Sequence, residues 1–98
     1  MLTSKQRAKL RGIASIQEDV AIIGKDGLTN PVISSIREVI TARELIKIKV
    51  LQMCELTPRE VADKLEEFLN AEVVGVVGSK VILYKRSDKK GIKHIDLN

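Results

Sequence analysis

Aromatic side chains are almost absent from this chain of 98 residues, which has no tryptophan, one phenylalanine (Phe68) and one tyrosine (Tyr84). Proteins that bind single-stranded nucleic acid by stacking its bases usually offer several exposed rings. This chain is not expected to bind in that way, since Phe68 fits a core position. Cysteine is also scarce: Cys54 is alone, which excludes an intrachain disulfide and a cysteine-rich zinc site.

Long apolar runs are missing as well. No run approaches the roughly 20 residues of a membrane-spanning helix. The N-terminal stretch MLTSKQRAKLRG mixes charged with apolar positions and lacks the continuous apolar block of a secretory signal. We therefore expect a cytoplasmic protein with no membrane partner.

Residues suited to catalysis are few. His94 has neither the cysteine nor a G-x-S-x-G serine motif near it in sequence, and we interpret it as a solvated residue of a charged tail. Glu66 and Glu67 point different ways from a predicted helix, and with Asp63 they form a hydrated acidic face rather than a metal cage. We therefore expect no enzymatic activity, no metal and no cofactor.

The net charge of +4 is unevenly distributed. Residues 1–17 contain four cations and no acid, residues 80–98 contain six cations and two acids, and residues 55–72 contain six acids and two cations. The four N-terminal cations are Lys5, Arg7, Lys9 and Arg11. Such a separation of charge suits a polyanionic partner. The alternative is that the charge only keeps the protein soluble.

Apolar periodicity and capping residues predict the order helix, strand, helix, strand, helix, strand, strand. The first helix begins with a Thr3/Gln6 capping box and the third with Thr57, Pro58 and Glu60. The other predicted elements are a buried strand at 19–24, a helix capped by Thr29 or Asn30, a strand at 44–50, and two strands joined at Gly78-Ser79.

This order predicts a single α/β domain over residues 1–98, with 87–98 as a charged C-terminal tail. Two strand–helix–strand units imply right-handed crossovers between parallel strands, and the final hairpin adds an antiparallel strand. If both crossovers advance the same way, their helices lie on one face of the sheet. The alternating lysines of 44–50 indicate that the other face is open. We therefore predict a two-layer sandwich, α-β-α-β-α-β-β.

The segment GKDGLTNP, residues 24–31, joins the first strand to the second helix. Gly24 and Gly27 can adopt positive φ and allow a ligand close to the backbone. The amino end of the following helix and Lys25 favour an anion, whereas Asp26 opposes one. The pattern is not a P-loop. Its backbone chemistry alone supports a tight turn and a phosphate site equally.

Four segments taken together resemble a known family. LTSKQRAKLRGIA, IGKDGLT, RELIKIKVL and VVGVVGSKVILYKR occur in the order and near the spacing of the CRM domain, named for chloroplast RNA splicing and ribosome maturation, in its single-domain bacterial YhbY-like form. The resemblance implies a fold similar to the C-terminal domain of translation initiation factor three. In that fold the last strand of a four-stranded mixed sheet is inserted, antiparallel, between the second and third.

The resemblance also implies binding to ribosomal RNA and association with precursors of the large ribosomal subunit, without catalysis. It transfers the family's loop onto Gly24, Lys25, Asp26 and Gly27. It transfers the family's basic first helix onto Lys5, Arg7, Lys9 and Arg11. Thr29, Arg37 and Lys85 complete the predicted RNA-binding residues. Ser15 departs from the family, whose members often have a histidine there.

Two functions remain open at this point. The first is a non-catalytic protein that binds structured RNA through the basic first helix and the glycine loop. The alternative is a protein-interaction module whose acidic third helix meets a basic partner, without direct contact to RNA.

Overall fold

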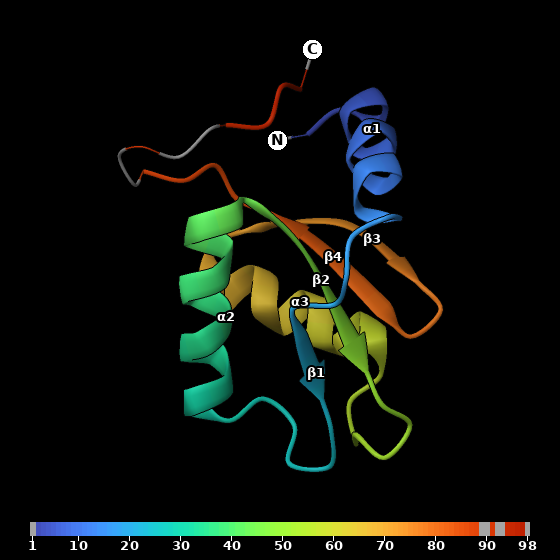
Figure 1. Cartoon of the computed structure of the whole chain (residues 1–98). Helices are drawn as coiled ribbons and strands as arrows, with labels where there is room; N and C mark the ends of the chain where they lie inside the picture. Colours follow the sequence, from blue (N-terminus) through green and yellow to red (C-terminus); the bar gives the residue numbers. More distant parts are fainter. Residues whose placement is uncertain (1, 89–90, 92–93, 98) are drawn as a thin grey trace.

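The computed structural model describes residues 2–88, 91 and 94–97 of the chain. The helices and strands in this part follow the predicted order (Figure 1). Their bounds are Ser4–Ala14 for α1, Ala21–Ile23 for β1, Asn30–Arg43 for α2, Leu45–Val50 for β2, Pro58–Leu69 for α3, Glu72–Val77 for β3 and Lys80–Tyr84 for β4. Among the described residues, none of the helices is long and apolar enough to cross a membrane.

The four strands form one mixed sheet in the order β1-β2-β4-β3. β1 and β2 are parallel, and β4 pairs antiparallel with both β2 and β3. The last strand is therefore inserted between the second and third, which confirms the arrangement that the resemblance implied. Gly78, with φ of +58°, lies in the tight turn between β3 and β4, as predicted.

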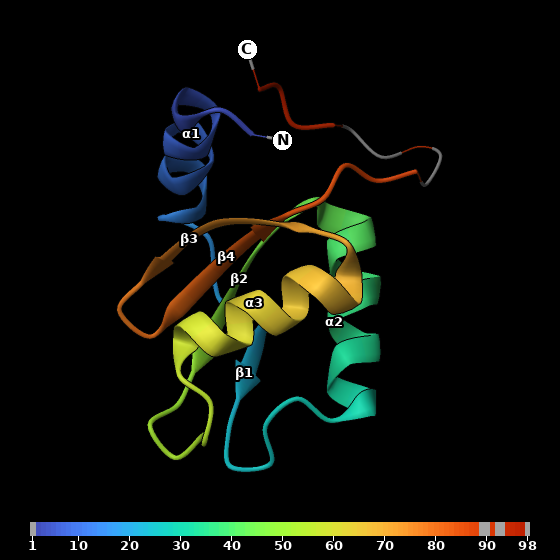
Figure 2. The ribbon, with the colours of Figure 1, turned by 180° about the vertical axis from the view of Figure 1, so that it is seen from behind.

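Helices α2 and α3 cover one face of the sheet, as expected for two crossovers that advance the same way (Figure 2). The apolar side chains between them and the sheet form the main core, in which most residues are fully buried. Its central members are Ile36, Ile40, Ile46, Ile48, Val61, Leu65, Leu69, Val81 and Leu83. The two-layer sandwich describes this part of the molecule.

Helix α1 lies on the opposite face and covers one end of it. A second apolar cluster joins the helix to β2, β3 and β4, and its buried members are Leu2, Leu10, Ala14, Leu45, Val74, Ile82 and Tyr84. Ile95 and Leu97 of the C-terminal segment pack against the same cluster. The described part of this segment is thus not only a charged tail, because two of its apolar residues are attached to the domain.

Local capping signals predicted the helix starts correctly. Thr3 and Thr57 each form a capping box, and the Thr29 side chain caps α2. α1 continues through Gly12 to Ala14, so the glycine does not end the helix early. Burial of the α1 stripe stabilises the helix beyond its local propensity.

Two predictions of burial are wrong. Phe68 was expected in the core, but its side chain lies at the edge of the α3 stripe and is 46% exposed. The strand predicted as buried over 19–24 is shorter, and Ile22 is 59% exposed. β1 is an edge strand. Ile22 points to the side of the sheet away from the main core, where no helix covers it.

Candidate functional site

The four predicted RNA-binding residues of α1 differ in their exposure to solvent. Lys5 and Lys9 are exposed, whereas Arg7 is half-buried with its Nε atom out of contact with solvent. Arg11 is exposed, and its aliphatic stem crosses β3 at Gly75, where an added Cβ would lie 3.2 Å from the Arg11 Cδ. The helix contains no acidic residue. The helix itself therefore contributes cations and no carboxylate at one end of the sheet.

The predicted loop is a tight turn. The amide of Gly27 donates to the carbonyl of Gly24 at 3.0 Å, and Lys25 and Asp26 are exposed at the apex. Gly27 has φ of +69°, a region that favours glycine, but Gly24 does not have positive φ. A Cβ at Gly24 would meet only the Leu51 side chain, at 3.7 Å. The positive φ that was expected at both glycines therefore occurs at Gly27 but not at Gly24.

The amino end of α2 offers few free amides. Thr29 Oγ1 accepts a hydrogen bond from the amide of Val32 at 3.4 Å, and Pro31 has no N–H. Among the first three residues of the helix, Asn30 keeps an amide that is not used for capping. An anion at this loop would therefore depend mainly on the apex residues and less on the helix end.

Arg37 and Lys85 are both engaged at the carboxyl end of α3. The Arg37 guanidinium donates to the carbonyl of Phe68 at 3.0 Å, and the Lys85 ammonium donates to the carbonyl of Leu69 at 2.9 Å. The last turn of α3 has no cation of its own. These two side chains satisfy its terminal carbonyls and oppose the negative end of the helix dipole. Sequence reasoning missed this structural role.

The predicted residues do not form one compact site. Figure 1 shows α1 at one end of the molecule and the loop between β1 and α2 at the other. The longest dimension of the molecule is 37 Å. The part of the sheet that neither α1 nor the other two helices cover lies between these ends. A ligand that contacts both groups must therefore be extended, as a nucleic acid helix or strand is.

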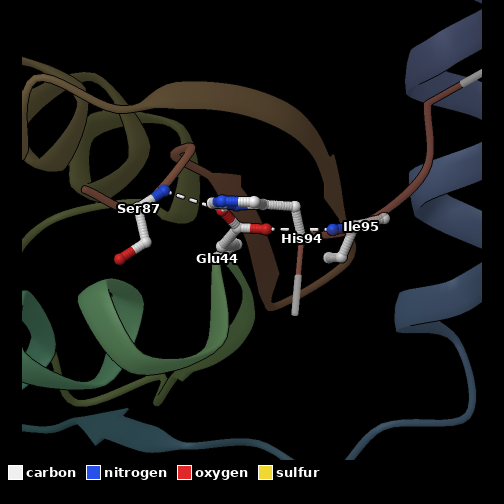
Figure 3. Close-up of polar contacts among 4 residues, drawn as sticks. All are labelled: Glu44, Ser87, His94 and Ile95. Carbon is white, nitrogen blue, oxygen red and sulfur yellow. Dashed lines mark hydrogen bonds and ion pairs between the residues drawn. The ribbon is translucent and has the colours of Figure 1, made fainter. Parts of the chain in front are cut away.

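A buried polar cluster at Glu44 was not predicted (Figure 3). The carboxylate is fully buried and accepts hydrogen bonds from the amides of Ser87, at 2.7 Å, and Ile95, at 3.0 Å. The Nδ1 atom of His94 lies 2.6 Å from the same carboxylate. The interpretation of His94 as a residue of a free charged tail is therefore wrong, because its ring, although 36% exposed, binds Glu44.

The environment of Glu44 sets its protonation state. Burial raises the pKa of Glu44, but the hydrogen bonds from Ser87, His94 and Ile95 outweigh it, so the pKa lies below its ordinary value. The ionised carboxylate can only accept, so the His94 ring nitrogen is the donor. Burial, followed by the negative charge of Glu44, raises the pKa of Tyr84. The cluster fastens the C-terminal segment to the start of β2.

Within the described ranges there is no group of three or more histidine, cysteine, aspartate or glutamate side chains that could hold a metal ion. Cys54 is a buried free thiol that belongs to the main core.

Known proteins similar to this chain have related names. A protein of Bacillus subtilis, named probable RNA-binding protein YqeI, is 38% identical over 97 residues, which cover 99% of each chain. A Haemophilus influenzae protein, named RNA-binding protein, is 29% identical over 92 residues, which cover 94% of this chain and 93% of that protein.

A solved structure and a family comparison agree with these relatives. The solution structure of the hypothetical protein SAV1595 from Staphylococcus aureus is similar with a TM-score of 0.78 and 37% identity, over 92% of this chain and 94% of that one. The CRS1/YhbY (CRM) domain matches residues 2–85. The match includes the basic helix, the glycine loop and the inserted last strand described above. This chain therefore belongs to the CRS1/YhbY (CRM) domain family.

Proposed function

We propose that this protein binds structured ribosomal RNA in the cytoplasm, without catalysing a reaction, and acts in assembly of the large ribosomal subunit. The observation that carries the proposal is the acid-free helix α1. Leu10 and Ala14 are completely buried, which fixes the orientation of the helix on the sheet and keeps Lys5 and Lys9 in solvent. The family and the names of the relatives support RNA as the polyanion.

Contact with RNA would be made mainly to phosphates. Lysine and arginine bind phosphates without reading the sequence, so specificity would come from the shape of a folded RNA. Lys25, at the apex of the glycine loop, is the proposed contact at the far end of the molecule. A folded Lys25→Ala variant that binds RNA as tightly as the wild type would show that the loop is only a turn.

Two experiments test the proposal. The affinity of the purified protein for ribosomal RNA fragments is expected to fall linearly with salt concentration on a double-logarithmic plot, because each phosphate contact releases counterions. An affinity that does not change with salt would contradict phosphate binding. In gradient sedimentation of a cell lysate, the protein is expected with free large-subunit precursors. Absence from all subunit precursors, with salt-dependent binding intact, would contradict only the assembly role.

The second candidate function is a protein interaction through α3. The specific observation in its favour is that Phe68 is partly exposed on α3, directly after a run of exposed acidic residues in the same helix. Those acids are Glu60, Asp63, Glu66 and Glu67. Under the leading proposal this surface faces away from RNA, so an Asp63→Asn, Glu67→Gln variant keeps its RNA affinity. Loss of RNA binding in that folded variant would place α3 at the RNA interface.

A further inference from the structure

The face of the sheet opposite α2 and α3 carries cations where α1 does not cover it. Lys47 and Lys49 alternate along β2 with apolar residues that are buried in the main core. Both lysines therefore point to the uncovered side, about 6.6 Å apart along the strand. Neither forms an ion pair or a side-chain hydrogen bond with another described residue.

Arg11 and Lys80 extend this group of cations. Lys80 of β4 points to the same face and forms an ion pair with Asp19, whose side chain is 19% exposed. Arg11 reaches the face from α1, and its guanidinium makes one long hydrogen bond, of 3.5 Å, to the carbonyl of Val74. In the described part of the chain no carboxylate forms an ion pair with Arg11 or with the two lysines of β2.

A cavity of about 160 Å³ opens on this face between the end of α1 and strands β3 and β4. It is lined by Arg11, Ser15, Lys47, Val77, Lys80 and Ile82. Val77 is 57% exposed and provides an apolar surface next to the cations. Sites that enclose a whole small molecule usually measure about 300–1,000 Å³. This smaller cavity suits one ring-sized group of a longer ligand.

The position of the face connects the two separated groups of predicted residues. Lys49 stands opposite Ile22 in the parallel register, and Ile22 is followed two residues later by Gly24. A row formed by Arg11, Lys47 and Lys49 therefore leads from the end of α1 toward the loop between β1 and α2. Figure 1 shows this face between those two elements, with α3 behind the sheet.

We propose that the uncovered face is a second RNA-contact surface, which binds one unpaired nucleotide and the phosphates beside it. Lys47 and Lys49 bind the phosphates. The base enters the cavity, where it contacts Val77 and the guanidinium plane of Arg11. Guanidinium groups stack on bases as aromatic rings do, so Arg11 supplies a stacking surface that this ring-poor chain otherwise lacks. The inference rests on the proposed function, since it names the part of the RNA that this face binds.

The chemistry of the face favours RNA over other ligands. Lys47 and Lys49, which form no ion pair with a described residue, favour a polyanion, and their row along the strand matches the repeated phosphates of a nucleic acid chain. The small cavity has the size for one base, and the cations beside it can bind the phosphates on either side of that base. A perfect duplex keeps its bases stacked inside and has none to insert, so the proposed partner is a bulge or loop nucleotide.

The first test removes the two lysines of β2 in the full chain. The Lys47→Gln, Lys49→Gln variant and the wild type are titrated with an RNA hairpin that carries a single-nucleotide bulge, over a series of potassium chloride concentrations. We expect weaker binding and a salt slope flatter by about 0.7 for each lost phosphate contact. The control is the Arg59→Gln, Lys64→Gln variant of α3, which has the same net charge as the Lys47→Gln, Lys49→Gln variant. Its affinity should depend on salt as steeply as that of the wild type. Lys47→Arg with Lys49→Arg should keep binding.

The second test concerns the base. The wild type is expected to bind the bulged hairpin at least about fivefold more tightly than the same stem without the bulge, the lower end of the contribution of one stacked base. Val77→Ser should remove this preference. Met53→Ser, which changes a residue that is 63% exposed on the loop before α3, should keep it. Unfolding curves of both variants establish that the fold is intact.

The outcomes separate this inference from the proposed function. A wild type that binds neither hairpin contradicts both. A wild type with steep salt dependence, whose β2 variant behaves like the α3 control, keeps the proposed function and overturns the second surface. Equal binding of the bulged and fully paired hairpins overturns the assignment of an unpaired nucleotide.

Discussion

The Nδ1 atom of His94 lies 2.6 Å from the Oε2 atom of Glu44, although 50 positions separate the two residues in the chain. The same carboxylate also accepts the amides of Ser87 and Ile95. Glu44 has φ of +66°, which is a strained conformation for a residue other than glycine. The three hydrogen bonds offset this strain, so the C-terminal segment and the junction between α2 and β2 stabilise each other.

Glu44→Gln is therefore expected to lower the free energy of unfolding by about 1.5–3 kcal/mol, the usual contribution of hydrogen bonds to a buried charge. The glutamine side chain has one acceptor oxygen, and its NH2 group cannot accept from the amides or the ring. Urea unfolding measures the change. Glu38→Gln, an exposed substitution on α2 with the same change in charge, should alter stability by less than about 0.5 kcal/mol. Equal effects of the two substitutions would contradict a structural role for the cluster.

The lowered pKa of Glu44 gives the cluster a defined pH dependence. A carboxyl group whose pKa is lower in the folded than in the unfolded state stabilises the fold above its unfolded pKa, which is about 4.3 for glutamate. That stabilisation is lost as the pH falls through the folded pKa. Wild-type stability should therefore fall more steeply below about pH 4 than that of Glu44→Gln. Parallel acid-unfolding curves for the two proteins would show that Glu44 does not contribute.

Local chemistry explains what the sequence could predict. Thr3, Thr29 and Thr57 cap helices through bonds to residues three positions away, so each start is encoded within one short segment. The relative directions of the strands were also predictable, because the crossovers make parallel strands and the tight turn at Gly78 makes an antiparallel pair. The family resemblance supplied the position of the inserted strand.

Tertiary contacts explain what the sequence could not predict. Glu44 stands beside a strand with alternating lysines, and nothing in its neighbours signals that its partners lie in the C-terminal segment. The same holds for Arg37 and Lys85, which bond carbonyls at the end of α3 from two other elements. Phe68 fits the helical period of the α3 stripe, but it is 46% exposed in the folded protein. Charge and periodicity in the sequence identify a basic surface. They do not show which of its cations form hydrogen bonds within the protein, as Arg37 and Lys85 do.

The two glycines of the loop should differ in their tolerance of alanine. Gly27 has φ of +69°, and an L-residue there is strained by about 1–2 kcal/mol. Gly24 has no positive φ, and its added Cβ would make an ordinary contact of 3.7 Å. Gly27→Ala is therefore expected to lower the free energy of unfolding by about 1 kcal/mol, and Gly24→Ala by less than about 0.5 kcal/mol. Equal losses in thermal or urea unfolding would contradict this assignment of the turn.

The exposed cations of α1 should contribute to RNA affinity through their charge. Lys5 and Lys9 lie one turn apart on the same ridge of the helix, beside a stripe that is anchored by Leu10 and Ala14. Glutamine is a good helix former, so Lys5→Gln with Lys9→Gln should leave α1 in place.

This variant is expected to bind ribosomal RNA fragments more weakly, whatever their sequence, because phosphate contacts do not read bases. The salt slope should flatten by about 0.7–0.9 for each lost contact. Arg59→Gln with Lys64→Gln on α3 is the matched control, since it changes the net charge equally on the far side of the sheet. If the α1 variant keeps the wild-type slope while folded, the helix is not part of the RNA interface. Its charge would then serve only solubility, and the cations of the uncovered face would have to carry the binding.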